Sequence, residues 1–447
     1  IGSAADEIIA DRVTIRGIGE LQLCFEESNW YAYAPADAIM VNRHDFLVPL
    51  VQNYVLADCP RSRDKIRQLF AYWMDSFDGA AMVRSDTPID AAIRLINWLF
   101  AFNCDALDLD EKGKRRLLRT IYLQLDYIYC RFSAGGNHLV LEALALYLYG
   151  GVFRNTRNGA DWHVWARQVL ITELDRQTTP DGVHTEQSMF YHQAVTTHFL
   201  KFFLGARHFG DEIWPAMRER FEAMLDYIHE TAMPDGTHPV VGDGESLTTA
   251  DREHWEARAL LASRWALFDK PVDAALVDRI DDSSIWLLAC SRTDVEATET
   301  PRESRVFRDS GLAVFRDRDA YVFIDAAPFS DPEFPHHGHA DALSFVACGP
   351  AGQLLIDPGG YGYYDDKFRR FFRSTAAHNT IEIDGENQSQ LFGVLGYGRL
   401  ANTVVEDFCC SEVFDYLQAT HDGYAPVSHT RALFLCKRPR NTLIILD

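Results

Sequence analysis

The chain has 447 residues, of which 47% are hydrophobic and 12% aromatic, and its formal net charge is −22. This length and apolar content allow a large buried core, divided between about two domains. The negative charge argues against broad binding to nucleic acid or to an anionic membrane surface. An acidic ligand would therefore require basic residues concentrated in one place. The aromatic content suits a cleft for sugar rings and equally suits aromatic packing between helices.

Nine cysteines are scattered along the chain without a Cys-x-x-Cys pair, so neither a disulfide framework nor a thiolate metal site is predicted. Most are expected to be buried free thiols, which leans against an oxidising compartment. No segment has the length and apolarity of a membrane span, and no signal peptide is visible. The abrupt start at Ile1 and the β-like run that stops at Asp447 indicate a fragment of a longer protein.

Residues 1–292 are expected to form an α/α toroid, because helical patterns follow one another from about residue 35 to residue 291. Apolar residues recur every three or four positions, and breakers such as Pro180-Asp181-Gly182 separate the runs. Helices of similar length with short turns indicate stacked αα-hairpins, and the lack of a strict repeat favours a toroid over a solenoid. The expected helices cover residues 46–57, 62–77, 89–102, 111–132, 137–149, 162–177, 187–203, 213–230 and 251–267.

The composition changes at about residues 293–304, a polar segment that is typical of a linker. Residues 305–447 are then expected to form an antiparallel β-sandwich, because short alternating apolar runs with turns dominate. The expected strands lie within residues 312–315, 321–325, 343–348, 354–357, 380–383 and 433–436.

Two clusters of polar residues lie at expected helix starts. Asn137 and His138 follow a Gly-Gly pair, at a position where an asparagine can cap the backbone amides of a helix. A helix cap followed by a packed histidine is a simpler explanation of this pair than a functional site. The second cluster begins at an Asp-Gly turn and carries Glu186, Gln187, Tyr191 and His192. So many hydrogen-bonding side chains at one helix entrance are costly unless they face a polar cleft, with ordinary capping as the alternative.

Two further clusters lie in the β-region. His337-Gly338-His339 places two imidazoles on one face of an extended strand, a common metal-ligand geometry. Asp357 follows an apolar run, and His378 follows a segment with three arginines. A His/Asp/His set drawn from loops of one domain suits zinc, which accepts nitrogen and oxygen ligands.

In order and spacing, these clusters resemble those of the heparinase II/III-like polysaccharide lyases, which are related to alginate lyases of the same architecture. The resemblance covers the chain from about Trp30 to its end. It implies that Asn137 and His138 bind and neutralise a substrate carboxylate, that Tyr191 is the catalytic tyrosine, and that His337 serves catalysis. The implied reaction is β-elimination at a uronic acid, which leaves a 4,5-unsaturated uronate end.

The resemblance also implies one zinc ion bound by His339, Asp357 and His378, with a mainly structural role. Because the reaction can be completed by the asparagine, the tyrosine and a histidine, activation of water by a metal is not required. Zinc would instead fix the loop that carries His337. Family resemblance favours a periplasmic or secreted protein, although the scattered cysteines leave a cytoplasmic location open.

The identity of the base depends on which C5 epimer is used. If the proton and the leaving oxygen share one face of the sugar, Tyr191 could perform both transfers; otherwise His337 or His192 must act as the base. The stabilised species is an enolate-like dianion, which hydrogen bonds from Asn137 and His138 would favour.

An acidic polysaccharide also needs binding groups. Three arginines are candidates to bind its carboxylates or sulfates: Arg94, Arg370 and Arg373. For each of them, a structural ion pair is a simpler explanation than substrate binding. Glu186 and Gln187 are candidates for contacts with the sugar.

Three other functions are consistent with parts of the sequence. A glycoside hydrolase on an α/α toroid would use a carboxylate pair such as Glu186 with Asp243 or Asp181. A non-catalytic glycan-binding protein would need only the aromatic cleft, and a metallohydrolase would use zinc to activate water. Ultraviolet absorbance of the product separates these classes, because only elimination creates a conjugated double bond.

Overall fold

A computed structural model describes the chain at residues 2–15, 19–22, 41–76, 87–244, 250–277, 297–298, 302–318, 320–331, 333–363 and 367–447. The chain divides into two compact units, Ile1–Leu170 and Ile171–Asp447. Among the described residues, no helix is both long and apolar enough to cross a bilayer.

The first unit is mainly helical and is organised around α8 (Gly136–Val152). This helix is buried almost all round, and α6 (Pro88–Asn103) and α7 (Glu111–Arg131) pack against it. Helix α6 begins with a capping box between Thr87 and Asp90. The other elements of this unit are α1 (Gly2–Ile9), β1 (Arg12–Ile15), β2 (Gly19–Gln22), α3 (Leu47–Ala57), α4 (Pro60–Ser76) and most of α9 (Arg157–Arg176).

Helices also open the second unit. Helix α10 (Met189–Phe209) packs against α11 (Trp214–Thr231) and α12 (Ala250–Phe268). The Ser188 hydroxyl caps α10 by accepting from the backbone N–H of Tyr191, and Gly210 ends the helix with a positive φ of 76°. The short elements β3 (Val272–Asp273), α13 (Ala274–Val277) and β4 (Ala297–Thr298) follow.

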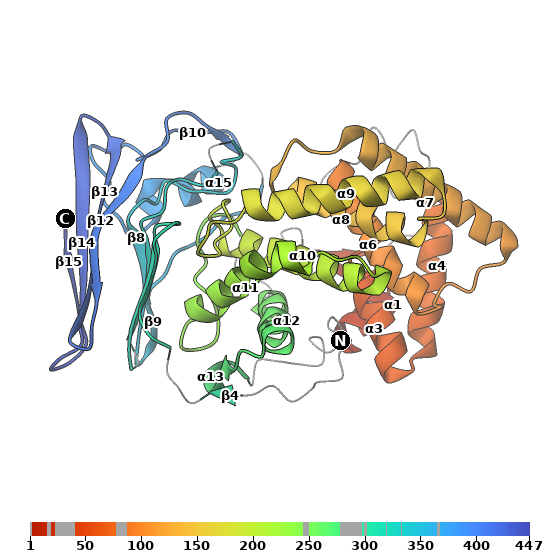
Figure 1. The fold of residues 1–447 in the computed structure, drawn as a ribbon, viewed down its shortest axis with the longest axis horizontal. Helices are drawn as coiled ribbons and strands as arrows, with labels where there is room; N and C mark the ends of the chain where they lie inside the picture. The colour runs from red at the N-terminus through yellow and green to blue at the C-terminus, as the bar shows by residue number, and fades with distance from the viewer. Residues whose placement is uncertain are drawn as a thin grey trace. The chain divides into compact units, whose positions relative to one another are not determined.

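Two antiparallel sheets complete the second unit (Figure 1). Inward-facing side chains of both sheets, among them Phe315, Ile324, Leu417 and Leu433, form one hydrophobic cluster. Short pieces α15 (Lys367–Phe372), η2 (Thr375–Ala377), β10 (Leu391–Phe392) and β11 (Gly396–Tyr397) lie between the two sheets in sequence. The first sheet contains β5 (Arg305–Phe307), β6 (Leu312–Asp317), β7 (Ala320–Asp325), β8 (Ser344–Gly349) and β9 (Gly352–Leu355), and the second contains β12 (Thr403–Cys410), β13 (Phe414–Tyr424), β14 (Val427–Cys436) and β15 (Thr442–Leu446).

The other face of the first sheet shares a core with the helices of the same unit. Met189 and Tyr227 from α10 and α11 belong to one buried cluster with Phe307, Tyr321 and Phe323 from the strands. The Tyr321 hydroxyl donates to the carbonyl of Thr231 at 2.7 Å, which ties β7 to the end of α11. Helices α10 and α11 therefore pack against the first sheet.

The predicted fold class, a helical region followed by antiparallel sheets, is confirmed. Most of the expected linker at 293–304 lies outside the described residues, and the domain boundary drawn there stays a prediction. The expectation that most cysteines are buried is wrong. Among the seven described cysteines all are free, but only Cys348 is buried, whereas Cys130, Cys409 and Cys410 are exposed.

Candidate active site

Tyr191 and His337 lie against each other in the second unit. Tyr191 belongs to the first turn of α10, and His337 to the loop between β7 and β8. Their rings are stacked, with centroids 3.7 Å apart and planes 19° apart. The hydroxyl groups of Tyr191 and Tyr363 are 2.5 Å apart, so the two tyrosines share a hydrogen bond. The sequence did not point to Tyr363.

Asp243 is the main hydrogen-bond acceptor of this site. It lies in the loop after α11, is 1% exposed, and accepts from His337 Nδ1 at 3.2 Å and from His339 Nε2 at 2.9 Å. Both terminal nitrogens of Arg369 also donate to it, one to each carboxylate oxygen. The preceding Gly242 has φ +67°, and a Cβ there would lie 2.9 Å from the carbonyl oxygen of His337. Glycine thus lets the loop approach the histidine closely.

The charge of Asp243 is retained in spite of its burial. Burial alone would raise the pKa of this carboxyl group, but hydrogen bonds from His337, His339 and Arg369 outweigh that effect and hold the pKa well below its usual range. A second carboxylate, Glu186, is buried and lies 3.8 Å from His337 Nε2. The His337 imidazole therefore has a carboxylate near each of its nitrogens.

His192, a candidate base in the sequence, is directed away from Tyr191 into the protein. Its Nδ1 accepts from the backbone N–H of His184 at 3.2 Å, and its Nε2 donates to the carbonyl of Met224 at 3.1 Å. Burial lowers its pKa to about 3. Because both ring nitrogens have hydrogen-bond partners and burial disfavours the charged ring, the position of His192 gives no support to a role as the base.

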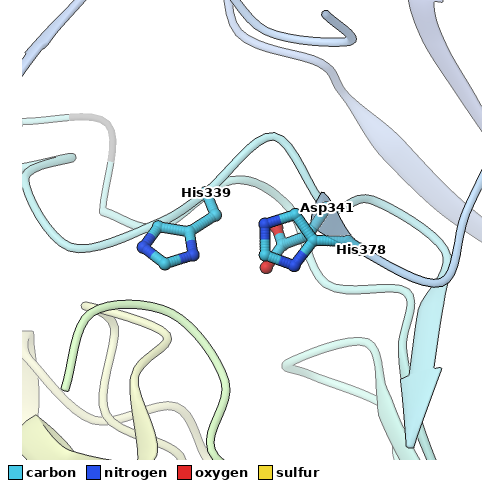
Figure 2. A group of neighbouring side chains, drawn as sticks. All are labelled: His339, Asp341 and His378. Carbon is cyan, nitrogen blue, oxygen red and sulfur yellow. The ribbon is translucent and has the colours of Figure 1, made fainter. Parts of the chain in front are cut away.

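A candidate metal-binding group lies beside this site. His339, Asp341 and His378 each offer a ligand atom, and these atoms all lie within 4.8 Å of one another. Figure 2 shows the three side chains gathered at loops. His339 Nδ1 and His378 Nε2 are buried and have no hydrogen-bond partner among the described residues. Two unpartnered imidazole nitrogens beside a carboxylate form a donor set that fits zinc.

The opposite nitrogens of these two imidazoles are held by carboxylates. Asp243 accepts from His339 Nε2, and Asp357 is hydrogen-bonded to His378 Nδ1 at 2.8 Å. This is the usual arrangement around metal-bound histidines, in which an outer carboxylate fixes the ring. The structure thus places Asp341 with the two histidines, whereas Asp357, the ligand predicted from the sequence, lies on the far side of His378. The assignment of Asp357 as a ligand stays a prediction.

Several carboxyl groups lie so close together around this metal-binding group that they disfavour one another's ionisation. Burial and the charge of Asp341 raise the pKa of Asp325 well above its usual range, and burial likewise raises that of Asp341. Burial would lower the pKa of His378, but Asp357 and Asp341 raise it to about 9. A pocket beside the group is lined by Asp325, His339, Asp341 and Phe329, among other residues. A bound cation would relieve the repulsion between these carboxylates.

Asn137 and His138 belong to the first unit. They form the first turn of α8, with Asn137 buried and His138 exposed. The loop before them is anchored by Glu142, which accepts from the backbone N–H of Ser133 at 2.6 Å and from the Ser133 hydroxyl at 2.8 Å. The expected helix start is therefore present at the predicted position.

The predicted substrate-binding arginines differ in exposure. Arg94 is fully buried and donates to Gln124 and to the carbonyl of Asn42, so its position gives no support to a role in binding substrate. Arg373 is also buried, with one nitrogen 2.7 Å from the carbonyl of Val394. Arg370, in contrast, is exposed on α15.

The two remaining substrate-binding candidates lie just before α10. Glu186 is buried near His337, as described above, and Gln187 is half-buried with a positive φ of 54°. Gln187 also lines the pocket beside the metal-binding group.

Solved lyase structures share this fold. A heparinase III structure covers 99% of the chain and 70% of its own length, with a TM-score of 0.74 at 16% identity. A structure of a heparan sulfate lyase from Pedobacter heparinus matches 99% of this chain and 68% of its own chain, with a TM-score of 0.64 at 18% identity. The architecture is therefore that of helix-plus-sheet polysaccharide lyases.

Sequence comparison agrees with this class. Residues 44–262 match the heparinase II/III N-terminus, and residues 299–447 match the heparinase II/III-like C-terminal region. The chain belongs to the heparinase II/III-like family.

Curated relatives are named heparin-sulfate lyases. One from Pedobacter heparinus is 24% identical over 336 residues, which are 72% of this chain and 46% of the relative. Another from Bacteroides stercoris is 26% identical over 267 residues, which are 58% of this chain and 37% of the relative. The chain thus spans about half the length of the relatives that it matches.

Proposed function

We propose that this protein is a polysaccharide lyase that cleaves an acidic, uronate-containing polysaccharide by β-elimination and leaves a 4,5-unsaturated uronate end. The observation that carries the proposal is the stacked Tyr191–His337 pair, with the tyrosine hydroxyl and a carboxylate-held imidazole at one place. Family membership and the names of the relatives support the same class of reaction.

β-Elimination breaks the C5–H and C4–O bonds of the uronate and forms a C4=C5 double bond. The electron pair of the C5–H bond becomes the new π bond, and the leaving oxygen takes a proton. Tyr191 is the proposed donor to that oxygen, because its hydroxyl ends a side chain that is otherwise packed against His337. His337 Nε2 is the proposed base where proton and leaving group lie on opposite faces, and Tyr191 can make both transfers where they share a face.

Asn137 and His138 are proposed to hold the uronate carboxylate. Removal of a proton beside a carboxylate builds a second negative charge on that group, and hydrogen-bond donors aimed at it lower the barrier. This part of the proposal follows from the family resemblance and from the polar first turn of α8.

Helix α15 is proposed to supply the contacts for an acidic glycan. Its outer face exposes Lys367, Phe368, Arg370 and Phe371, which combines cationic groups with aromatic rings. The inward-facing side of the same helix carries Arg369, which is bound to Asp243. This local basic surface would allow a protein of net charge −22 to bind a polyanion.

Zinc is the proposed resident metal, held by His339 and His378 with Asp341 or Asp357. When bound, it would neutralise the surrounding carboxylates and fix the loops that carry them, a structural role. His337, in the same loop as His339, would be positioned indirectly.

The geometry disfavours a hydrolase that uses Glu186 with Asp243. Such an enzyme needs an acid and a base that reach the sugar. Asp243 is buried, ionised and occupied by two imidazoles and an arginine, so it is not available to substrate.

The test is a panel of polysaccharides, including heparan sulfate and alginate, assayed for a product that absorbs ultraviolet light. We expect turnover on at least one, and a roughly 100- to 10,000-fold loss of kcat in Tyr191→Phe with KM little changed. Tyr424→Phe is the matched control, because the hydroxyl of Tyr424 donates to the carbonyl of Ile381 in the β-region. New reducing ends without ultraviolet absorbance, or full turnover by a folded Tyr191→Phe protein, would refute the proposal.

A further inference from the structure

We infer that Asp243 is a positioning residue that sets the tautomers of two histidines at once, so that the candidate base and the candidate metal ligand depend on one carboxylate. The catalytic half of the inference, which concerns His337, rests on the proposed function. The metal-binding half, which concerns His339, can be tested by zinc binding without any activity.

The contacts of Asp243 determine which imidazole nitrogens carry hydrogen. An ionised carboxylate can only accept hydrogen bonds. His337 must therefore present Nδ1–H to Asp243, at 3.2 Å, and His339 must present Nε2–H, at 2.9 Å. A neutral imidazole that donates from one nitrogen has its lone pair on the other. In its neutral form, His337 therefore has its lone pair on Nε2, and neutral His339 has its lone pair on Nδ1.

These two lone pairs are on the nitrogens that the proposed chemistry needs. His337 Nε2 is the atom that would take the C5 proton where proton and leaving group lie on opposite faces, and Glu186, 3.8 Å away, would stabilise the resulting imidazolium. His339 Nδ1 is the buried, unpartnered atom that lies with Asp341 and His378. One carboxylate thus holds two histidines of the same loop in opposite tautomers.

Arg369 keeps this acceptor charged and fixed. Its two terminal nitrogens bind the two oxygens of Asp243, and its own position is held by the carbonyl of Val394 at 3.1 Å. The backbone N–H of Asp243 donates to the carbonyl of His337 at 2.7 Å, so the two loops are also joined through the main chain. The carboxylate cannot rotate away from either imidazole without losing several bonds.

The informative substitution is Asp243→Asn, which keeps the shape but replaces one acceptor oxygen with an N–H donor. The amide cannot accept from all four donors, so at least one imidazole must change its tautomer or lose its partner. We expect the affinity for zinc alone, measured by competition with a chelator, to fall about 10- to 100-fold. On a substrate for which His337 is the base, we also expect kcat to fall by about 100-fold or more with KM little changed, because a base in the wrong tautomer does not alter substrate binding.

Asp415→Asn is the matched control. Asp415 is fully buried and carries a structural ion pair with Lys437 at 2.9 Å. Its substitution should lower the unfolding midpoint without changing zinc affinity or kcat. Equal effects of the two variants on zinc affinity would overturn the inference, because loss of a buried carboxylate would then explain both.

A measurement on the unsubstituted protein covers the case in which Asp243→Asn does not fold. Nitrogen-15 spectra of histidine-labelled protein distinguish the tautomers, and His337→Gln and His339→Gln assign the two signals. We expect hydrogen on Nδ1 of His337 and on Nε2 of His339. The opposite tautomer at either ring, or an unsubstituted protein that binds no zinc, would overturn the corresponding half. If the spectra and zinc affinity agree but no polysaccharide is cleaved, the proposed function fails and the metal-binding half stands.

Discussion

Glu142 provides a direct test of the electrostatics near the proposed carboxylate-binding turn. Its side chain is buried in α8, where burial raises its pKa to about 7, and the nearby charge of Asp90 adds to that effect. Hydrogen bonds from Ser133 act in the opposite direction but do not cancel it. The folded protein therefore keeps this carboxyl group protonated in a range where the unfolded chain has lost the proton.

Stability should fall as the pH rises through this range. Below a pH of about 4.5 both states are protonated and the effect is absent, and above about pH 7 it is complete. Raising the pKa from 4.5 to about 7 corresponds to about 3 kcal/mol, at about 1.4 kcal/mol per pH unit. Glu142→Gln cannot ionise, so this loss should be missing in the variant.

The assay is urea unfolding of both proteins at pH values from 4.5 to 8. At low pH the variant should be the less stable protein, because an amide replaces one of the two oxygens that accept from Ser133. The difference should shrink or reverse by about pH 8. Ser133→Ala should steepen the fall of the glutamate protein, since it removes a hydrogen bond that lowers the pKa. A constant offset between the unsubstituted protein and the Glu142→Gln variant across this range would refute the reasoning.

Three further outcomes are expected. Asn137→Ala should lower kcat by at least about 100-fold in the ultraviolet assay, through poorer stabilisation of the dianion; a change in KM alone would assign it to binding. His339→Ala should remove about one zinc ion per chain in elemental analysis and lower the unfolding temperature, and retention of the ion would remove this ligand from the site. Arg370→Ala should raise KM several-fold and weaken its salt dependence, whereas Arg116→Ala, an exposed ion pair in the first unit, should do neither.

Periodic patterns in the sequence were sufficient to predict most of the long helices, whereas the strand expected at residues 380–383 does not form and β12 and β13 were not expected. The helix expected at residues 111–132 is present as α7 (Glu111–Arg131), and the one expected at 89–102 is present as α6 (Pro88–Asn103). These segments bury one continuous face, so local spacing reports their structure directly. The change from helices to short strands was visible for the same reason.

The centre of the site could not be predicted in this way. Asp243 lies alone in a Gly-Asp-Gly loop, and its partners His337, His339 and Arg369 are 94, 96 and 126 residues further along the chain. Only the folded chain brings these groups together. The sequence alone gives no reason to prefer Arg369 over its neighbour Arg370, because only the helical turn directs the two side chains to different faces.

Side-chain orientation also distinguishes the histidines. His192 and Tyr191 are adjacent in sequence, but the helix turns one towards the Met224 carbonyl and the other towards His337. Whether Asp341 or Asp357 would bind the metal likewise depends on loop conformation. Both carboxyl groups lie near His378, and the sequence does not show which of them faces the metal-binding group. Residue type and order identify the candidate group, and side-chain direction selects its members.

The core shared by α10, α11 and the first sheet limits how this protein can be cut or recombined. A division near residue 300 follows the change from helices to strands, yet it would expose Phe307 and Tyr321 on one fragment and Tyr227 on the other. Asp181 would also lose the backbone N–H groups of Asp309 and Ser310. A chimaera that exchanges only the β-region with a relative should aggregate, whereas one that carries residues 171–447 as a block keeps this core and the Tyr191–His337 pair intact. Specificity in this protein would then be inherited with those helices, and substitutions on the two sides of the core should co-vary.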